Sequence, residues 1–413
     1  MQRYIIIVCI LCLSMTFVSC SKPKYLENES ENLETENQSL EDTLGEDTED
    51  EFAFLKEGNS GYATNYKGLF YVEIPTNQIK YYDYSSGETE VWCTNLTCNH
   101  NSKECSAYVE EDYRYVKWYD NHVYKIDYDD KGEYLVQYKE DGTGEIRLAN
   151  LLGDYLTGAK VDIGRTYKGR LYYFVKKDDN TIDVNRVSLS AKDNIENLFN
   201  IDVTDTKVSA SGMYVNDNCI YISMAKYEAG DSKKFSRQIY RYDFTSNELK
   251  LLDGLNNISR SCANESLYYL TDENRLYRVN NDGISNEIAS GLADELKYND
   301  YNIYCNSDYI VFSRDALAAM RNENVDIYIY NIKNDTLSCI SDGSEEEADG
   351  EISYVEIQGG VQIQGGGKRN FWGVIGLSGE YVFISGKNLK CMYAIRLEDG
   401  SVTKLPFEIN VSK

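Results

Sequence analysis

The feature that most constrains the fold of this chain is a pair of short apolar runs that recurs along it. A first run, such as "GLFYVEI" (68–74) or "ESLYYLT" (265–271), is followed by a second, such as "RLYRVNN" (275–281), and then by a tight polar turn. Seven first runs start at intervals of 53, 48, 49, 47, 43 and 71 residues. A repeat of roughly 45 residues with four short strands is typical of a β-propeller blade.

Composition supports strands over helices. The chain has 37 tyrosines and only three prolines, and no long stretch has helical periodicity. We therefore predict an all-β fold in which residues 53–413 form a β-propeller. Seven four-stranded blades are the best count, with six or eight as alternatives, because the longest interval holds an insertion (345–370) that is a long loop or part of an eighth blade. A large β-sandwich or two smaller β domains is the competing architecture.

The N-terminal segment, residues 1–19, predicts export. One positive charge, Arg3, precedes an apolar run that is long enough for a signal peptide and short for a membrane-spanning helix. The segment ends "FVSC", which resembles a bacterial lipobox, and that resemblance implies a lipid on Cys20 as the mature N-terminus. An ordinary signal peptide cut nearby, or an uncleaved anchor, would explain the same run.

Residues 20–52 predict an acidic tether between this anchor and the folded part. After Cys20, the segment 21–52 carries twelve acidic residues and two lysines, with almost no apolar content. Such a segment cannot bury enough surface to fold, and its like charges keep it extended. The whole chain has a net charge of −26, which repels phosphates and excludes nucleic acid as an expected partner. We expect an extracytoplasmic monomer, lipid-anchored to the bacterial cell membrane.

A cysteine-rich stretch, "WCTNLTCNHNSKEC" (92–105), is the clearest candidate site. Cys93, Cys98, His100 and Cys105 offer three sulfurs and one imidazole, a donor set that suits a closed tetrahedral zinc site. The stretch lies between the last strand of one repeat and the first strand of the next, so we expect an inter-blade loop whose structure depends on the metal. A disulfide between two of the cysteines, or a loop without a ligand, are the alternatives.

Two resemblances add to this interpretation. The pattern "ENRLYRVNNDG" (273–283) resembles repeats of TolB-like and YWTD-type propellers, which implies the fold and no function. The cysteine stretch resembles a C-x4-C-x-H-x4-C motif of uncharacterised propeller lipoproteins from clostridia and their relatives. The matching positions are Cys93, Cys98, His100, Cys105 and Ala107.

The sequence predicts a binding module for a protein, peptide or glycan. No catalytic residues stand out, and we expect binding in preference to catalysis. A polysaccharide-active hydrolase or lyase on a propeller scaffold is the alternative, and a purely structural surface role is a third. Strand parity places the long insertions at one end of the predicted propeller, where recognition loops are usually found. The predicted ligand contacts there are Lys233, Lys234, Arg237, Arg314, Arg321, Lys368, Arg369 and Trp372.

Overall fold

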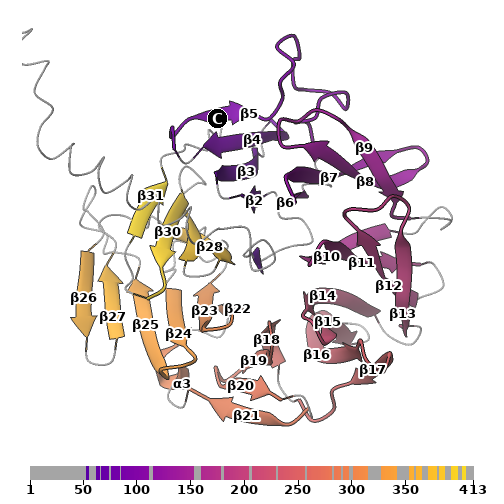
Figure 1. The fold of residues 1–413 in the computed structure, drawn as a ribbon. Helices are drawn as coiled ribbons and strands as arrows, with labels where there is room; N and C mark the ends of the chain where they lie inside the picture. Colours follow the sequence, from indigo (N-terminus) through magenta and orange to yellow (C-terminus); the bar gives the residue numbers. More distant parts are fainter. Residues whose placement is uncertain are drawn as a thin grey trace, which may run out of the picture.

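The structure is a computed structural model, and its described residues form a ring of β-sheets (Figure 1). It describes residues 53–54, 62–65, 67–73, 76–83, 85–110, 115–152, 160–177, 181–203, 207–228, 231–255, 258–280, 283–289, 292–296, 301–314, 327–341, 353–357, 360–364, 371–378, 381–386, 392–398 and 402–405. The described strands form seven sheets, five of them with four strands. In each of these five, consecutive strands pair antiparallel, and the first strand lies innermost in the ring.

The four-stranded sheets follow one another along the chain. The first comprises β2 (Tyr62–Thr64), β3 (Gly68–Glu73), β4 (Gln78–Asp83) and β5 (Thr89–Val91). The second comprises β6 (Val116–Tyr119), β7 (His122–Asp129), β8 (Gly132–Lys139) and β9 (Ile146–Asn150). The third comprises β10 (Lys160–Tyr167), β11 (Arg170–Lys176), β12 (Thr181–Ser188) and β13 (Ile195–Asp202). The fourth comprises β14 (Lys207–Val215), β15 (Cys219–Glu228), β16 (Asp231–Asp243) and β17 (Glu248–Leu251). The fifth comprises β18 (Ile258–Ala263), β19 (Leu267–Thr271), β20 (Leu276–Val279) and β21 (Ser285–Ile288).

Two sheets are larger than the predicted four strands. A short helix, α3 (Leu292–Glu295), precedes the first of them, which comprises β22 (Tyr301–Cys305), β23 (Tyr309–Arg314), β24 (Ile327–Asn331), β25 (Thr336–Ser341), β26 (Ser353–Ile357) and β27 (Gly360–Gln364). The last sheet comprises β1 (Ala53–Phe54), β28 (Phe371–Ser378), β29 (Tyr381–Gly386), β30 (Met392–Arg396) and β31 (Val402–Leu405). The described part of the insertion 345–370 is therefore a hairpin, β26–β27, that joins the outer edge of the sixth sheet through a parallel pairing of β25 with β27.

The core lies between neighbouring sheets. Alternate residues of a strand point to opposite faces, so a strand that is buried along its length must have both faces covered. β11 is such a strand, because its five central residues are buried and only Arg170 and Lys176 at its ends are exposed. On one side its Tyr173 packs with Tyr124 and Leu135 of the second sheet. On the other side its Phe174 packs in the cluster that the third sheet shares with the fourth.

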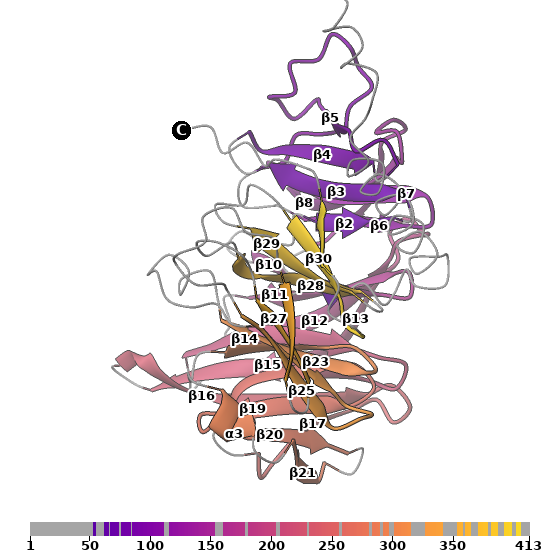
Figure 2. The same cartoon turned by 90° about the vertical axis from the view of Figure 1, so that its left-hand side faces the viewer.

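Each four-stranded sheet has two distinct ends. The turns from first to second strand and from third to fourth strand lie at one end, which we call the turn end; Lys168–Gly169 is an example. The connections from second to third strand, and the links to the next sheet, lie at the other end, the loop end. The hairpin of β15 and β16 extends well beyond its neighbours at the loop end (Figure 2).

The all-β propeller prediction is confirmed by this ring of sheets. The prediction of four strands holds for five sheets and is wrong for the two sheets that gain a hairpin or an N-terminal strand. The predicted signal peptide, Cys20 and the acidic tether lie outside the described residues. Within the described part of the chain, no helix combines the length and the apolar character needed to cross a membrane.

Candidate metal centre

The cysteine loop leaves the first sheet after β5 and returns to the same sheet. Trp92 is the last residue held to β4, through a bond of its backbone N–H to the Ile79 carbonyl at 3.0 Å. The chain comes back at Ala107, whose carbonyl accepts the Ile79 N–H at 2.6 Å, and Tyr108 bridges Gln78 antiparallel. The returning segment thus extends the outer edge of the sheet where β5 ends, at the loop end.

The returning segment also covers the core between the first two sheets. Cys105, Ala107 and Val109 are buried in a cluster with Trp92 and Val123, and the cluster joins side chains of both sheets. Ser106 is buried too, and its hydroxyl donates to the Trp92 carbonyl at 3.3 Å. The loop therefore contributes fully buried side chains only at its C-terminal end, while Cys93 and Cys98 pack, partly buried, against the same cluster.

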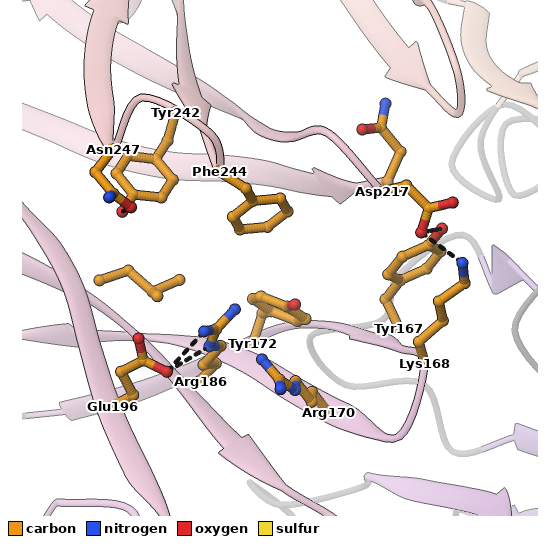
Figure 3. Close-up of a pocket in the computed structure, with 12 residues that line it drawn as sticks. Tyr167, Lys168, Arg170, Tyr172, Arg186, Glu196, Asp217, Tyr242, Phe244 and Asn247 are labelled. Carbon is orange, nitrogen blue, oxygen red and sulfur yellow. Dashed lines mark hydrogen bonds and ion pairs between the residues drawn. The ribbon is translucent and has the colours of Figure 1, made fainter.

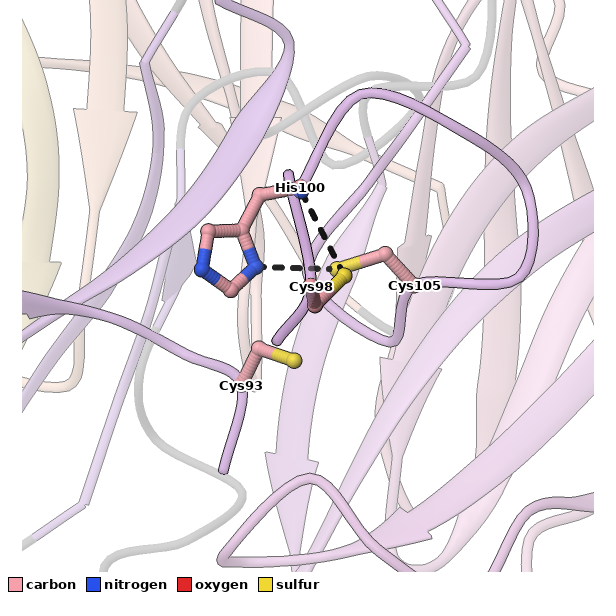
Figure 4. Close-up of side chains that lie close together, drawn as sticks. All are labelled: Cys93, Cys98, His100 and Cys105. Atoms are coloured by element: carbon pink, nitrogen blue, oxygen red, sulfur yellow. Dashed lines mark hydrogen bonds between the residues drawn. The ribbon is translucent and has the colours of Figure 1, made fainter. Parts of the chain in front are cut away.

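The four predicted ligands come together at this point (Figure 4). The Sγ atoms of Cys93, Cys98 and Cys105 and a ring nitrogen of His100 all lie within 4.8 Å of one another. His100 Nδ1 lies 3.4 Å from Cys105 Sγ. Tetrahedral zinc with bonds of about 2.0–2.3 Å places its ligand atoms about 3.5–3.8 Å apart, so a small contraction of this group would close around the ion.

Local turns bring the ligands into place. The Asn95 side chain accepts the Thr97 N–H at 3.1 Å, and the Asn95 carbonyl accepts the Cys98 N–H at 3.0 Å. His100 has a φ of 55°, the left-handed conformation that reverses the chain and directs its ring back to the sulfurs. A further turn links Ser102 and Cys105 through a 3.0 Å backbone bond.

The sulfurs lie in different environments. The backbone N–H of His100 donates to Cys98 Sγ at 3.3 Å and lowers the pKa of the Cys98 thiol. Burial raises the pKa of the Cys105 thiol to about 12. All three cysteines of the group are free thiols. Three cysteine sulfurs and one imidazole are a donor set that fits zinc. Because a metal ion binds cysteine as the thiolate, loading would release protons.

Lys125 on β7 supports the cysteine loop, and the sequence analysis missed it. Its side chain is fully buried beneath the returning segment, and its Nζ donates to the Tyr108 carbonyl at 2.9 Å. The same ammonium pairs with Asp127 at 3.1 Å. Burial raises the pKa of Asp127, and the Lys125 charge opposes that shift. Lys125 therefore binds the returning segment of the cysteine loop to the second sheet.

The structure describes few of the predicted ligand contacts. Arg237 on β16 is half-buried, and burial lowers its pKa. Arg314 at the end of β23 is buried, with 4% of its surface exposed. The side chains of Lys233, Lys234, Arg321, Lys368, Arg369 and Trp372 lie outside the described part. The predicted ligand surface thus stays a prediction.

Comparisons with known proteins bear on the fold alone. No protein-family model matches the chain, and no curated protein matches it. Among solved structures, the tricorn protease aligns with 87% of this chain at 12% identity and a TM-score of 0.49, and this chain spans only 35% of that protein. The β-propeller domain of the Trilobed protease from Pyrococcus furiosus aligns with 87% of this chain and 97% of its own length, at 12% identity and a TM-score of 0.47. The uncharacterized protein lmo1340 from Listeria monocytogenes EGD-e aligns over 69% of this chain and 79% of its own, at 10% identity and a TM-score of 0.40.

Proposed function

We propose that this protein is a lipid-anchored, extracytoplasmic binding module in which one structural zinc ion holds the cysteine loop on a propeller scaffold. The observation that carries the proposal is the group of Cys93, Cys98, His100 and Cys105, whose ligand atoms lie within 4.8 Å. Four protein ligands leave no open position for substrate or water, and zinc sites of this kind are structural. The metal then rigidifies a surface without taking part in a reaction.

A rigid surface at the loop end suits recognition. The returning segment of the cysteine loop lies beside the start of β4, where the connection from β3 arrives. Loops held on a rigid scaffold bind with less loss of conformational entropy than free loops do. A protein, peptide or glycan outside the cell is the class of ligand that an anchored module of this kind would meet.

The anchor is tested by cell fractionation. Cys20→Ala should release the protein into the medium, because stable membrane anchoring depends on the acyl chains and each buried methylene contributes about 0.8 kcal/mol. Cys12→Ala, a cysteine in the apolar run of the same segment, is the matched control and should stay with the membrane fraction. Equal membrane association of both variants would contradict the lipoprotein assignment.

Binding is separated from catalysis by a turnover screen. The purified mature protein, incubated with peptide and polysaccharide libraries, should retain ligands on an affinity column and release no products over hours. Products that accumulate in proportion to protein and time would replace the binding role with an enzymatic one.

A further inference from the structure

Two adjoining clefts open at the turn end of the third, fourth and fifth sheets. The first has a volume of about 420 Å³ and lies between the third and fourth sheets (Figure 3). The second has a volume of about 440 Å³ and reaches the fifth sheet. Tyr167, Asn216 and Asp217 line both, so the two clefts form one trough. Each volume falls within the range of roughly 300–1,000 Å³ that is usual for ligand pockets.

Aromatic rings form the floor and wall of the first cleft. Tyr172 and Tyr242 are buried beneath it, while Phe244 is half-buried and borders the open space. The Phe244 ring is held edge-on to Tyr242, with centroids 5.9 Å apart, and lies 6.5 Å from the Tyr172 ring. A ring fixed in this way offers a flat apolar surface at little entropic cost.

The trough has a small excess of positive charge in a chain of net charge −26, because four cationic and three acidic side chains line it: Lys168, Arg170, Arg186 and Arg278, and Glu196, Asp217 and Glu265. Arg186 pairs with Glu196 at 2.7 Å, and Lys168 pairs with Asp217. Arg170 has no side-chain partner among the described residues, and Figure 3 shows it beside Arg186 in the first cleft.

The second cleft also contains an arginine that forms no ion pair among the described residues. Arg278 donates only to the Ser266 hydroxyl, at 3.0 and 3.1 Å, and has no carboxylate partner in the described part of the chain. Each cleft therefore contains one guanidinium that forms no ion pair among the described residues, although the Glu265 carboxylate also lines the second cleft. Arginine in this state binds a carboxylate through two parallel hydrogen bonds.

The trough is preformed. Lys168 and Gly169 have φ values of 44° and 68°, the conformation of a tight hairpin turn, and the Gly169 carbonyl accepts the Leu189 N–H at 2.9 Å. Asn216 accepts the backbone N–H groups of Asn218 and Cys219, both at 2.9 Å, and its own amide donates to the Asn264 carbonyl at 2.6 Å. The last bond joins the fourth sheet to the fifth under the shared part of the trough.

We propose that this trough binds an acidic oligosaccharide, with sugar rings against Phe244 and Tyr167 and carboxylates at Arg170 and Arg278. The inference rests on the proposed binding function and names the ligand class and the place. Among the described residues that line the trough, Leu198 is the sole aliphatic one, so these residues form no deep apolar pocket for the anchor residue of a peptide. Aromatic faces, side-chain amides and unpaired arginines instead match a polyhydroxylated chain with carboxylates.

Calorimetric titration with a hexasaccharide of galacturonic acid tests the proposal. The purified protein should bind the hexasaccharide, and Arg170→Gln should weaken binding at least about tenfold, because a charge-assisted bidentate contact is lost. Lys176→Gln is the matched control: it removes one charge from the other exposed end of the same strand and should leave binding unchanged. Phe244→Ala should weaken binding about fivefold.

Further probes separate the outcomes. A neutral glucose hexasaccharide should bind much more weakly than the acidic one. No heat of binding at millimolar hexasaccharide, or equal loss in Arg170→Gln and Lys176→Gln, overturns the site. Tight binding of a glutamate hexapeptide that is lost in Arg170→Gln overturns the sugar class and leaves the binding module intact. Cleavage of the hexasaccharide overturns the binding role and leaves the trough as its substrate site.

Discussion

His100 is the residue on which the cysteine loop depends most. Its backbone adopts the left-handed conformation, its N–H donates to the Cys98 sulfur, and its Nδ1 lies 3.4 Å from the Cys105 sulfur. The ring therefore completes the ligand set at the place where the backbone reverses. Without a fourth donor, a three-thiolate group is left open to water and competing ligands.

His100→Ala should lower the zinc content of the protein purified under reducing conditions from about one ion per chain, with zinc affinity reduced at least tenfold (roughly the loss caused by removing even an indirect partner of a metal ligand). Hydrogen exchange should speed up in residues 93–105 and stay slow in β7 and β8, because the sheets have their own core. Metal analysis measures the zinc content, and mass spectrometry measures the hydrogen exchange.

The second histidine of the chain supplies the control. His122 lies at the start of β7, with Nδ1 2.6 Å from the Asp120 carbonyl, and His122→Ala should keep the metal. A wild-type protein without zinc, carrying a disulfide among Cys93, Cys98 and Cys105, would refute the metal assignment.

At this scale the sequence predicted the four side chains of the candidate metal site but not the contacts that support the loop. The spacing of three cysteines and a histidine indicated the site, and the structure brings all four together. Lys125 gave no such signal, since its surroundings "YKID" are those of an ordinary strand. Its burial follows from the segment around Tyr108, which folds back over it, and no local pattern contains that information.

Among the elements, the turns repeat more faithfully than the strands. Asn65 and Asn216 occupy the same position before the second strand of their sheets, and each accepts two backbone N–H groups of its turn. Asp83 and Asp243 do the same before the fourth strand. Such side chains replace missing backbone partners and fix the register of each hairpin.

Asn65→Ala and Asp83→Ala should lower the free energy of unfolding by different amounts, although each removes a side chain that accepts two backbone N–H groups of a turn in the first sheet. Among the described residues, the Asp83 side chain bonds only within its turn, and its loss should lower the free energy of unfolding by about 1 kcal/mol. Asn65 is buried and also donates to Glu140 of the second sheet at 2.6 Å, so its loss should lower that free energy by about 2–3 kcal/mol.

Chemical denaturation of the two variants beside the wild type measures the difference. Equal midpoints for both would show that the bond between sheets adds nothing to the stability.

The tight turns were predictable from their Asp, Asn and Gly residues. The trough was not, because it forms only where turns from three sheets meet, and the sequence analysis had placed the ligand at the loop end.

At the scale of the whole molecule, the two parts of the described chain farthest apart in sequence meet in one sheet. β1 pairs antiparallel with β28, with Ala53 opposite Leu377 and Phe54 opposite Gly376. The pairing adds an N-terminal strand to the inner edge of the C-terminal sheet (Figure 1). The repeat period predicted the ring, but this closure was not predictable, because "AF" after a long acidic segment has no strand pattern of its own.

Removal of this strand should therefore destabilise the propeller, whereas removal of the preceding segment should not. A chain that begins at Leu55 loses β1 and exposes backbone N–H and C=O groups of β28, so its free energy of unfolding should fall by roughly 1–3 kcal/mol. A chain that begins at Ala53 keeps the pairing and should unfold like one that begins at Ser21. Denaturant unfolding gives the free energies, and hydrogen exchange at Gly376 and Leu377 locates the loss. Identical midpoints and identical exchange in the two truncated chains would mean that the ring is closed without β1.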